Sequence, residues 1–429
     1  MKLPTEASDG GTTVPAGIWC PELDLGTETV RSRTAPEPSH ASVRALVRLR
    51  GRTLGYVTIG RPPAQVTAHD LAEAARRAFP AAALTVAADE GAQVVDSPTQ
   101  AESSGEAAGP RVSLVVCTRN RGEQLVACLN DLRELTYRNL DIIVVDNAPT
   151  DDSTRRYVDE ASALDPRIRY ATEPRPGLSC ARNRGLREAR GEYIAYTDDD
   201  VSVDADWITQ LVAAFGDGEK VACVTGLVCT AALTTSAEIY FDARTASWST
   251  RTEPVTYDLD RHALDDALYP YSAGIFGTGA NFAFDRAVLV DMGGFDEALG
   301  AGTLTRGGED LDIFVRVLRA GYAIRYDPSA VVWHHHRADE AALVQQMYGY
   351  GTGLTAYLAK MLSVRETRND ILRRVPKGLA RMAKIKRATD DRLDTAAAPK
   401  GAMRRELTGY LAGPYLYARA RRRLHRHPA

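Results

Sequence analysis

Runs of apolar residues alternate with helical patterns from Arg111 onward. The runs VSLVVCT, DIIVVDN and YIAYTDDD are nearly continuous in apolar residues, which predicts strands buried on both faces of a parallel sheet. A segment with helical spacing of apolar residues follows each run, at residues 123–135, 179–188 and 206–215. This βαβαβ alternation predicts an α/β sheet, in which ligands bind at the carboxyl ends of the strands.

Segments of a different pattern lie on both sides of this region. Two alternating stretches meet at Gly51-Arg52 and predict a hairpin, and Thr67 with Asp70 three residues later predicts the capped start of a helix. The next segment, SPTQAESSGEAAGP, has the composition of a linker. The expected parts are a small α+β domain of unknown role, a flexible linker, an α/β domain and a basic helical C-terminal region: residues 1–95, 96–110, 111–337 and 338–429.

Charge is distributed unevenly along a chain that is nearly neutral as a whole. The 429 residues contain 53 Lys/Arg and 56 Asp/Glu, but the part from Lys360 to the end contains 19 Lys/Arg and six Asp/Glu. Such a tail could meet anionic lipid, nucleic acid or an acidic partner, and a solvated helical face is the alternative. No zinc-finger spacing or aromatic-rich strand platform accompanies it, so we expect no nucleic-acid partner.

The location of the protein is predicted from features that the chain lacks. Its six cysteines have no C-x-x-C spacing, which fits a reducing compartment. The first residues, MKLPTEASDGG, form no apolar signal core, and no run approaches the roughly 18 apolar residues that span a bilayer. We therefore expect a cytoplasmic protein, with peripheral contact at the inner face of the membrane through the basic helices.

Asp198, Asp199 and Asp200 end the third predicted strand. Adjacent carboxylates repel one another unless they are solvated or neutralised, and a divalent cation that prefers oxygen ligands would neutralise them. Because alternate residues of a strand face the same way, Asp198 and Asp200 share one face and Asp199 points to the other. A solvated turn with helix-capping aspartates is the alternative.

Eight strings follow one another in an order that resembles one known family. They are VSLVVCTRNR, DIIVVDN, GLSCARNRGL, YIAYTDDDV, FGTGANFAF, GGFDE, GGEDLDIFVRVLRAGY and AVVWHHH. In this order and spacing they resemble the motifs of family 2 glycosyltransferases of the GT-A fold, over about residues 111–337. The basic tail is similar to that of some actinobacterial members. The resemblance implies a GT-A (Rossmann-like) nucleotide-sugar-binding domain.

The resemblance also implies which residues bind the donor. The positions that match the donor pocket are Thr118, Arg119, Asn120, Asp146, Arg182, Asn183, Asp198 and Asp199. Asp198 and Asp200 match the D-x-D motif that holds Mn²⁺ or Mg²⁺, and His334 matches a position that completes the metal shell in some members. A solvated histidine cluster is the alternative for His334, and the sequence leaves open which histidine of the run binds metal.

The acceptor side is implied by two further motifs. Asp310 matches the general base and Glu309 a residue that orients the acceptor; charge stabilisation of a helix N-terminus is the alternative. Gly279 and Asn281 match a segment that lines the acceptor side. The expected activity is inverting, metal-dependent transfer of a hexosyl group from a nucleoside-diphosphate sugar to an unidentified glycan, lipid, peptide or natural product. UDP is expected by analogy, with dTDP or GDP as options, and a sugar-1-phosphate nucleotidyltransferase or a non-catalytic sugar-nucleotide-binding module is the alternative.

Overall fold

The computed structural model describes residues 16–82, 109–216, 220–260, 266–392, 399 and 401–426. Most of the expected linker and the N-terminal segment considered above lie outside the described residues.

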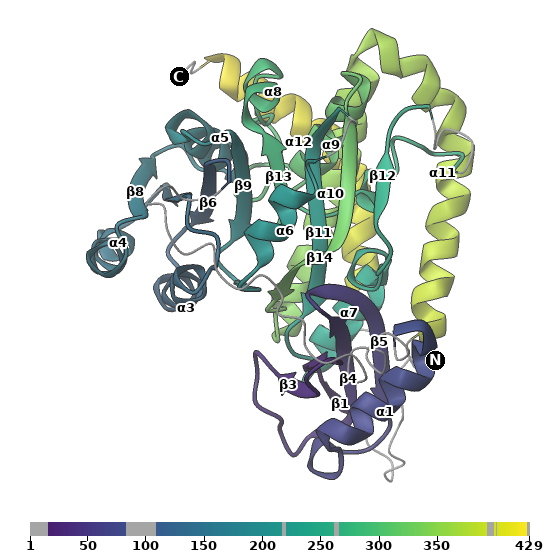
Figure 1. Ribbon diagram of the computed structural model, residues 1–429. Helices are drawn as coiled ribbons and strands as arrows, with labels where there is room; N and C mark the ends of the chain where they lie inside the picture. Colours follow the sequence, from purple (N-terminus) through teal and green to yellow (C-terminus); the bar gives the residue numbers. More distant parts are fainter. Residues whose placement is uncertain are drawn as a thin grey trace.

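Within the described residues, a nine-stranded mixed sheet forms the centre of the protein (Figure 1). The strand order is β10-β14-β11-β13-β9-β6-β7-β8, and β12 pairs with β14. The bounds are β6 (Val112–Thr118), β7 (Leu140–Asn147), β8 (Ile168–Glu173), β9 (Tyr193–Asp198), β10 (Val201–Val203), β11 (Val221–Thr230), β12 (Val255–Tyr257), β13 (Phe282–Asp285) and β14 (Ala323–His334). The three predicted strands are β6, β7 and β9; they are adjacent and parallel, so their carboxyl ends share one edge of the sheet.

Successive side chains of β6 pack alternately into two hydrophobic cores, one on each face of the sheet, as expected of a strand buried on both faces. Leu114 and Val116 pack in the core formed with α3, α4 and α6, whereas Val115 and Cys117 pack in the core formed with α5, α8 and α9. The helices of the first face are α3 (Gly122–Arg133), α4 (Ser153–Leu164) and α6 (Trp207–Ala213). Those of the second are α5 (Leu178–Glu188), α8 (Arg286–Asp291) and α9 (Glu309–Arg319). The predicted α/β architecture is confirmed.

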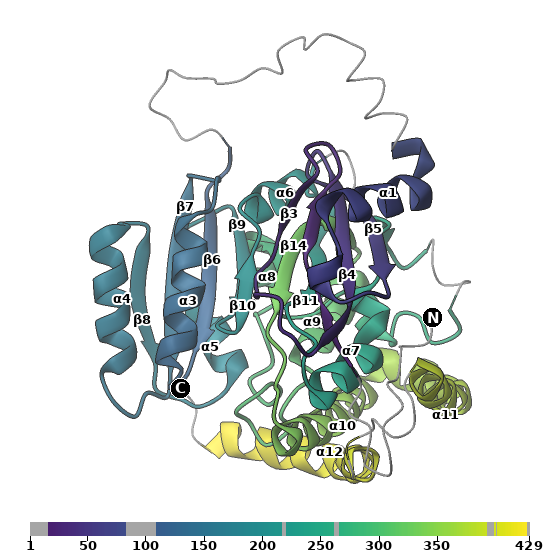
Figure 2. The ribbon, with the colours of Figure 1, turned by 90° about the horizontal axis from the view of Figure 1, so that it is seen from below.

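A smaller five-stranded sheet precedes this domain and packs against it (Figure 2). Its elements are β1 (Gly17–Trp19), β2 (Glu22–Asp24), β3 (Thr29–Arg31), β4 (His40–Leu49), β5 (Arg52–Ile59), the 3-10 helix η1 (Pro63–Gln65) and α1 (Ala68–Ala78). The predicted hairpin is formed by β4 and β5, with positive φ at Arg50 and Gly51 in its two-residue loop. The predicted capping box of Thr67 and Asp70 begins α1.

The smaller sheet is joined to the central sheet by polar and apolar contacts. Arg48 forms an ion pair with Asp204, and the Thr53 hydroxyl donates to the Pro328 carbonyl at 2.7 Å. Leu46 packs in a cluster with residues of β11 and β14. The smaller sheet therefore packs over β11 and β14 of the central sheet.

Helices dominate the C-terminal region as predicted: α10 (Glu340–Ser363), α11 (Arg365–Arg392) and α12 (Ala402–Arg426). Glycines allow α10 and α12 to lie very close, because a Cβ on Gly351 would stand 2.3 Å from the Glu406 carbonyl oxygen. Gly353 approaches the backbone of Gly307 and Gly308 just before α9 in the same way. The helices therefore pack on the α/β domain, with α12 on the outside (Figure 2). Among the helices described, none combines the length and the apolar character needed to cross a membrane.

Helix α7 (Ser236–Ser249) and the 3-10 helix η2 (Ala273–Ile275) lie in a segment where the sequence shows no readable motif. Thr235 and Glu238 form a complete capping box at the start of α7. The following residues Ile239, Tyr240 and Phe241 are consecutive and all buried, so the helix has little amphipathic periodicity. This arrangement explains why apolar spacing alone did not predict α7.

Candidate functional site

The aspartate run lies at the carboxyl end of β9, beside the end of β14. Asp198 is the last residue of β9, and Val201, which opens β10, pairs with His334. The strand register therefore places Asp200 next to the histidine, with 3.5 Å between Asp200 Oδ1 and His334 Nε2. The predicted association of Asp200 with His334 thus follows from β10 pairing with β14.

Asp199 is held by residues at the end of β6. The Thr118 hydroxyl donates to Asp199 Oδ2 at 2.7 Å, and Arg121 Nη1 lies 2.7 Å from Asp199 Oδ1 and 2.8 Å from Asp200 Oδ2. Both oxygens of Asp199 are therefore occupied by protein groups. Asp199 therefore braces the turn through Thr118 and Arg121, and its predicted contact with the donor stays a prediction.

Burial and neighbouring charges shift the pKa values of the three carboxylates differently. Burial raises the pKa of Asp198 to about 7; Arg182 opposes this rise and the neighbouring carboxylates add to it. Burial also raises the pKa of Asp199. At Asp200 the effect of burial is outweighed by His334 and Arg121, so the pKa is lowered. A carboxylate that resists ionisation among like charges is stabilised when a cation binds to it.

Asp146, at the end of β7, has a free hydrogen-bonding position. Its residue is fully buried, Tyr170 donates to its Oδ2 at 3.0 Å, and its Oδ1 has no hydrogen-bond partner. Burial raises the pKa of this carboxyl. Asn120, with a left-handed φ of 54°, follows β6 and accepts a hydrogen bond from Thr150. Because Asp146 Oδ1 is enclosed by protein atoms, the predicted contact of this residue with the donor stays a prediction.

Glu309 and Asp310 begin α9, directly after Gly308 in the left-handed conformation. Asp310 is half-buried; its Oδ1 accepts from the Leu311 amide at 2.8 Å and its Oδ2 from the Gly279 amide at 3.3 Å. Glu309 is more buried, and burial, followed by the charge of Asp310, raises its pKa.

Arg182 joins the aspartate run to the start of α9. Its guanidinium lies 3.1 Å from Glu309 Oε1 and 3.6 Å from Asp198 Oδ1, and it donates to the Gly279 carbonyl at 3.0 Å. The side chain is 2% exposed and packs over the ring of Phe282. The two acidic motifs, more than 100 positions apart, therefore meet at one buried cation. Any Cβ on Gly279 would stand 2.7 Å from this guanidinium, so Arg182 explains why glycine is present there.

Two predicted site residues, Asn183 and Asn281, have their side-chain amides bonded within the protein, and their predicted roles stay predictions. Asn281 is fully buried: its amide nitrogen donates to two backbone carbonyls, and its oxygen accepts from Trp207 Nε1. Asn183 exchanges hydrogen bonds with the backbone of Phe295 and so supports the turn after Gly294. Both amides are fully used in bracing the fold. Arg119, by contrast, is exposed at the end of β6, and its role stays a prediction.

The donor atoms present fit a divalent cation that a phosphate ligand would help to hold. Asp198 and Asp200 supply carboxylate oxygens and His334 an imidazole nitrogen, which are ligand types of Mn²⁺ and Mg²⁺ sites. Over the described part of the chain, no three acidic, histidine or cysteine side chains are already gathered closely enough to hold a metal alone. Arg121, which the motifs did not single out, is a cation already placed beside this group.

The sheet and its acidic edge define an α/β domain of the class in which ligands bind at the carboxyl ends of the strands. Residues 113–289 match the family model described as glycosyl transferase family 2. The chain therefore carries a family 2 glycosyltransferase domain, as the resemblance implied. The match ends before α9 and β14, which contribute Glu309, Asp310 and His334.

Curated relatives share this part of the chain. A pre-mycofactocin glycosyltransferase of Mycobacterium tuberculosis is 26% identical over 253 residues, which are 58% of this chain and 47% of that protein. The glycosyltransferase GlyA of Streptococcus pneumoniae is 34% identical over 101 residues, which are 24% of this chain and 14% of that protein. The aligned part is thus less than half of each relative's length. A mannosyltransferase of Pyrobaculum calidifontis, solved with GDP-Man and Mn²⁺, is 20% identical, with a TM-score of 0.45 over 81% of this chain and 94% of that chain. This score is too low to support a further conclusion.

Proposed function

We propose that the protein is an inverting, metal-dependent glycosyltransferase that uses a nucleoside-diphosphate sugar, UDP being the first candidate nucleotide. The observation that carries the proposal is the position of Arg182, which contacts both Asp198 and Glu309. This contact brings a donor-side carboxylate and the base-bearing helix to the same edge of the sheet.

On the donor side, the proposed contact with the base is made by Asp146, which lies at the end of β7. Asp198, Asp200 and His334 would hold a divalent cation, which would supply positive charge against the diphosphate of the leaving group. Arg121 fixes Asp200, so this carboxylate needs little rearrangement when the donor binds.

On the acceptor side, Asp310 takes the proton of the attacking hydroxyl. The acceptor oxygen forms a bond to the anomeric carbon while the bond from that carbon to the diphosphate breaks. The leaving group therefore departs with the bonding electron pair, and the hydroxyl proton ends on Asp310. Glu309 contacts Arg182 and acts as a positioning residue for this helix rather than as a contact of the acceptor.

A thermal-shift panel of UDP-, dTDP- and GDP-sugars with Mn²⁺, followed by measurement of nucleoside diphosphate release, tests this function. We expect one nucleotide class to stabilise the protein and excess EDTA to abolish turnover, with recovery when Mn²⁺ is restored. Full turnover in excess chelator contradicts the metal assignment. Formation of a nucleoside triphosphate from sugar nucleotide and pyrophosphate identifies a nucleotidyltransferase instead, and binding without turnover identifies a sugar-nucleotide-binding module.

We also propose that helix α12 makes peripheral contact with an anionic membrane. Leu407, Leu411 and Tyr415 are 52%, 85% and 66% exposed and recur every four residues, so they share one outward face. The exposed residues Arg404 and Arg422 lie near the same face. An apolar face with arginines beside it matches the apolar interior and negative surface of such a bilayer.

A further inference from the structure

The three histidines at the end of β14 face different surroundings. His335 Nε2 lies 3.1 Å from the Ser202 hydroxyl of β10. His334 and His336 lie together, with their Nδ1 atoms 2.8 Å apart, and the ring of His336 packs against Phe241 at 4.6 Å between centroids. At that distance one Nδ1 carries the hydrogen and the other accepts it.

A chain of hydrogen bonds continues from His336 into the protein. His336 Nε2 lies 3.0 Å from the Thr230 hydroxyl, which donates to Asp242 Oδ1 at 2.6 Å. Both oxygens of Asp242 accept from Arg44, each at 2.8 Å. We call these four residues, Arg44, Asp242, Thr230 and His336, the histidine relay. They come from β4, α7, β11 and the segment after β14.

The far end of the histidine relay determines the direction of every hydrogen bond in it. Asp242 is ionised because the Arg44 guanidinium holds it in a two-pronged pair, so it only accepts hydrogen bonds. Thr230 has one hydroxyl hydrogen and gives it to Asp242. The Thr230 oxygen must then accept from His336 Nε2.

The direction of the hydrogen bond between His334 and His336 follows from the donation by His336 Nε2. A neutral His336 that carries its hydrogen on Nε2 has a lone pair on Nδ1 and accepts from His334 Nδ1. Neutral His334 then has a lone pair on Nε2, the atom that faces Asp200 Oδ1 at 3.5 Å. The reverse arrangement would place two lone pairs against each other in the 2.6 Å contact between Thr230 and Asp242. His334 Nε2 and Asp200 Oδ1, which each present a lone pair, are 3.5 Å apart, and the proposed cation would bind to both atoms.

We propose that the histidine relay holds His334 in the tautomer whose Nε2 carries a lone pair, which makes His334 the histidine that binds the divalent cation beside Asp200. The proposal rests on the proposed metal-dependent function and adds the residues that prepare its ligand. Arg44, which is in the N-terminal unit, acts as a positioning residue through Asp242. The small N-terminal domain thereby acquires a role in the site. Hydrogen-bonded partners of this kind fix the orientation and tautomer of metal-binding histidines.

Thr230→Val and Thr230→Ser separate this role from a packing role. Valine keeps the shape of threonine without the hydroxyl, whereas serine keeps the hydroxyl. Ser202→Ala, which removes the partner of His335, is the matched control. Two quantities are measured on the full-length protein, in the presence of the nucleoside diphosphate that the thermal-shift panel identifies. They are the Mn²⁺ affinity, from the electron paramagnetic resonance signal of free Mn²⁺, and the ring ¹⁵N chemical shifts of labelled histidines. The His334 signals are assigned with His334→Gln.

We expect wild type to show His334 protonated at Nδ1 and bare at Nε2. Thr230→Val is expected to populate the other tautomer and to weaken Mn²⁺ binding about tenfold. Thr230→Ser and Ser202→Ala are both expected to keep the wild-type tautomer of His334 and the wild-type Mn²⁺ affinity. Asp242→Asn provides a second disruption of the relay if Thr230→Val does not fold.

The proposal is wrong if His334 of the wild-type protein carries its hydrogen on Nε2. It is also wrong if Thr230→Val has the same His334 tautomer and the same Mn²⁺ affinity as wild type. A bare Nε2 in wild type together with no Mn²⁺ binding supports the relay and refutes the metal-dependent function. The two proposals therefore fail separately.

Discussion

Asp310 is the residue on which the proposed bond-forming step depends. Its two oxygens accept hydrogen bonds from the backbone amides of Leu311 and Gly279, so its orientation does not depend on another side chain. Its neighbour Glu309 instead faces Arg182. The difference in partners assigns proton transfer to one carboxylate and positioning to the other.

Asp310→Asn keeps the shape of the side chain and one of the two accepting oxygens, but it removes the base. We expect kcat to fall by a factor on the order of 10² to 10⁴, while the thermal shift produced by the sugar nucleotide with Mn²⁺ stays as in wild type. Asp291→Asn, at the exposed end of α8, is the control and should retain activity. Wild-type kcat in Asp310→Asn would assign the base elsewhere.

Motif positions predicted which residues gather at the site better than which way each side chain points. Asp198, Asp200 and Asp310 lie at the predicted edge, whereas Asn281 and Asn183 point into the protein. An asparagine looks the same in a sequence motif whether its side chain contacts the backbone or a ligand. The contacts of Arg121 and Asp242 were not predicted because they join residues 78 and 198 positions apart, and no local pattern encodes such pairs.

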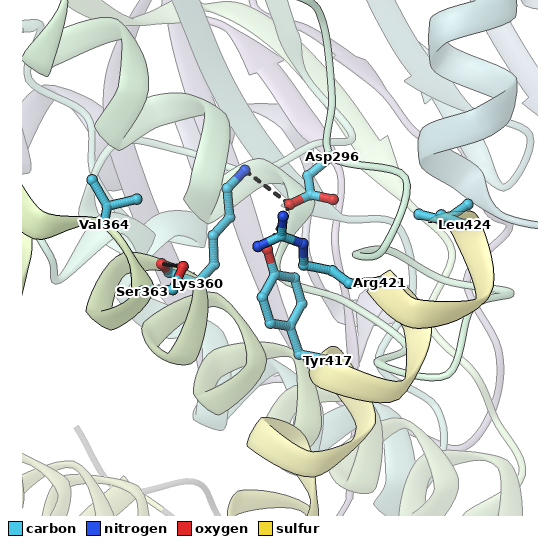
Figure 3. Close-up of a pocket in the computed structure, with 7 residues that line it drawn as sticks. All are labelled: Asp296, Lys360, Ser363, Val364, Tyr417, Arg421 and Leu424. Carbon is cyan, nitrogen blue, oxygen red and sulfur yellow. Dashed lines mark hydrogen bonds and ion pairs between the residues drawn. The ribbon is translucent and has the colours of Figure 1, made fainter. Parts of the chain in front are cut away.

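At the scale of elements, α9 is held in place by α10. Lys360 of α10 donates to Asp312 of α9 at 2.8 Å. The same ammonium lies 3.0 Å from Asp296, as Figure 3 shows. Tyr417 of α12 donates to the same Asp296, beside a cavity of about 310 Å³. Asp312 is fully buried, and burial raises its pKa, so the lysine is needed to compensate its charge.

Lys360→Met removes this compensation and leaves Asp312 with Arg316 at 3.4 Å. We expect the free energy of unfolding to fall by about 3 kcal/mol, because a buried charge loses its nearest partner. Urea unfolding measures the change. Lys360→Arg should retain most of the stability, and equal midpoints for Lys360→Met and wild type would show that the ion pair adds nothing.

Strands and helices could be predicted from the sequence where their buried residues follow one simple spacing. β6, β7 and β9 are buried on both faces and their continuous apolar runs revealed them. Helix α7 has buried residues on successive positions, and β12 is only three residues long. Their burial depends on partners distant in the sequence, so local spacing could not predict them.

At the scale of the whole molecule, α12 is part of the packed structure, so removal of the C-terminal region would disturb α9 as well as any membrane contact. Point changes on the outward face are the sharper test. We expect Leu411→Glu to abolish sedimentation with vesicles containing phosphatidylglycerol and to leave the melting temperature unchanged, because Leu411 is 85% exposed.

Two comparisons complete this test. Wild type should not sediment with purely phosphatidylcholine vesicles, because arginines contribute only with an anionic surface. Leu164→Glu, another exposed leucine, on α4, is the control and should sediment as wild type does. Equal sedimentation of wild type and Leu411→Glu excludes the membrane proposal, and a change of oligomeric state in Leu411→Glu would assign the face to a second copy of the chain.

The place of β14 in the chain has a consequence for synthesis. β14 lies between β10 and β11 in the central sheet, although it is translated about a hundred residues after both. While the ribosome is making residues 231–322, β10 has no strand partner and the aspartate run has no His334 beside it. Strands β6 to β9 can pair during this interval, but the edge that holds the metal ligands is assembled only after β14 emerges. A nascent chain stalled before residue 323 would therefore expose an unfinished sheet edge, which makes that stage the one most in need of chaperone protection.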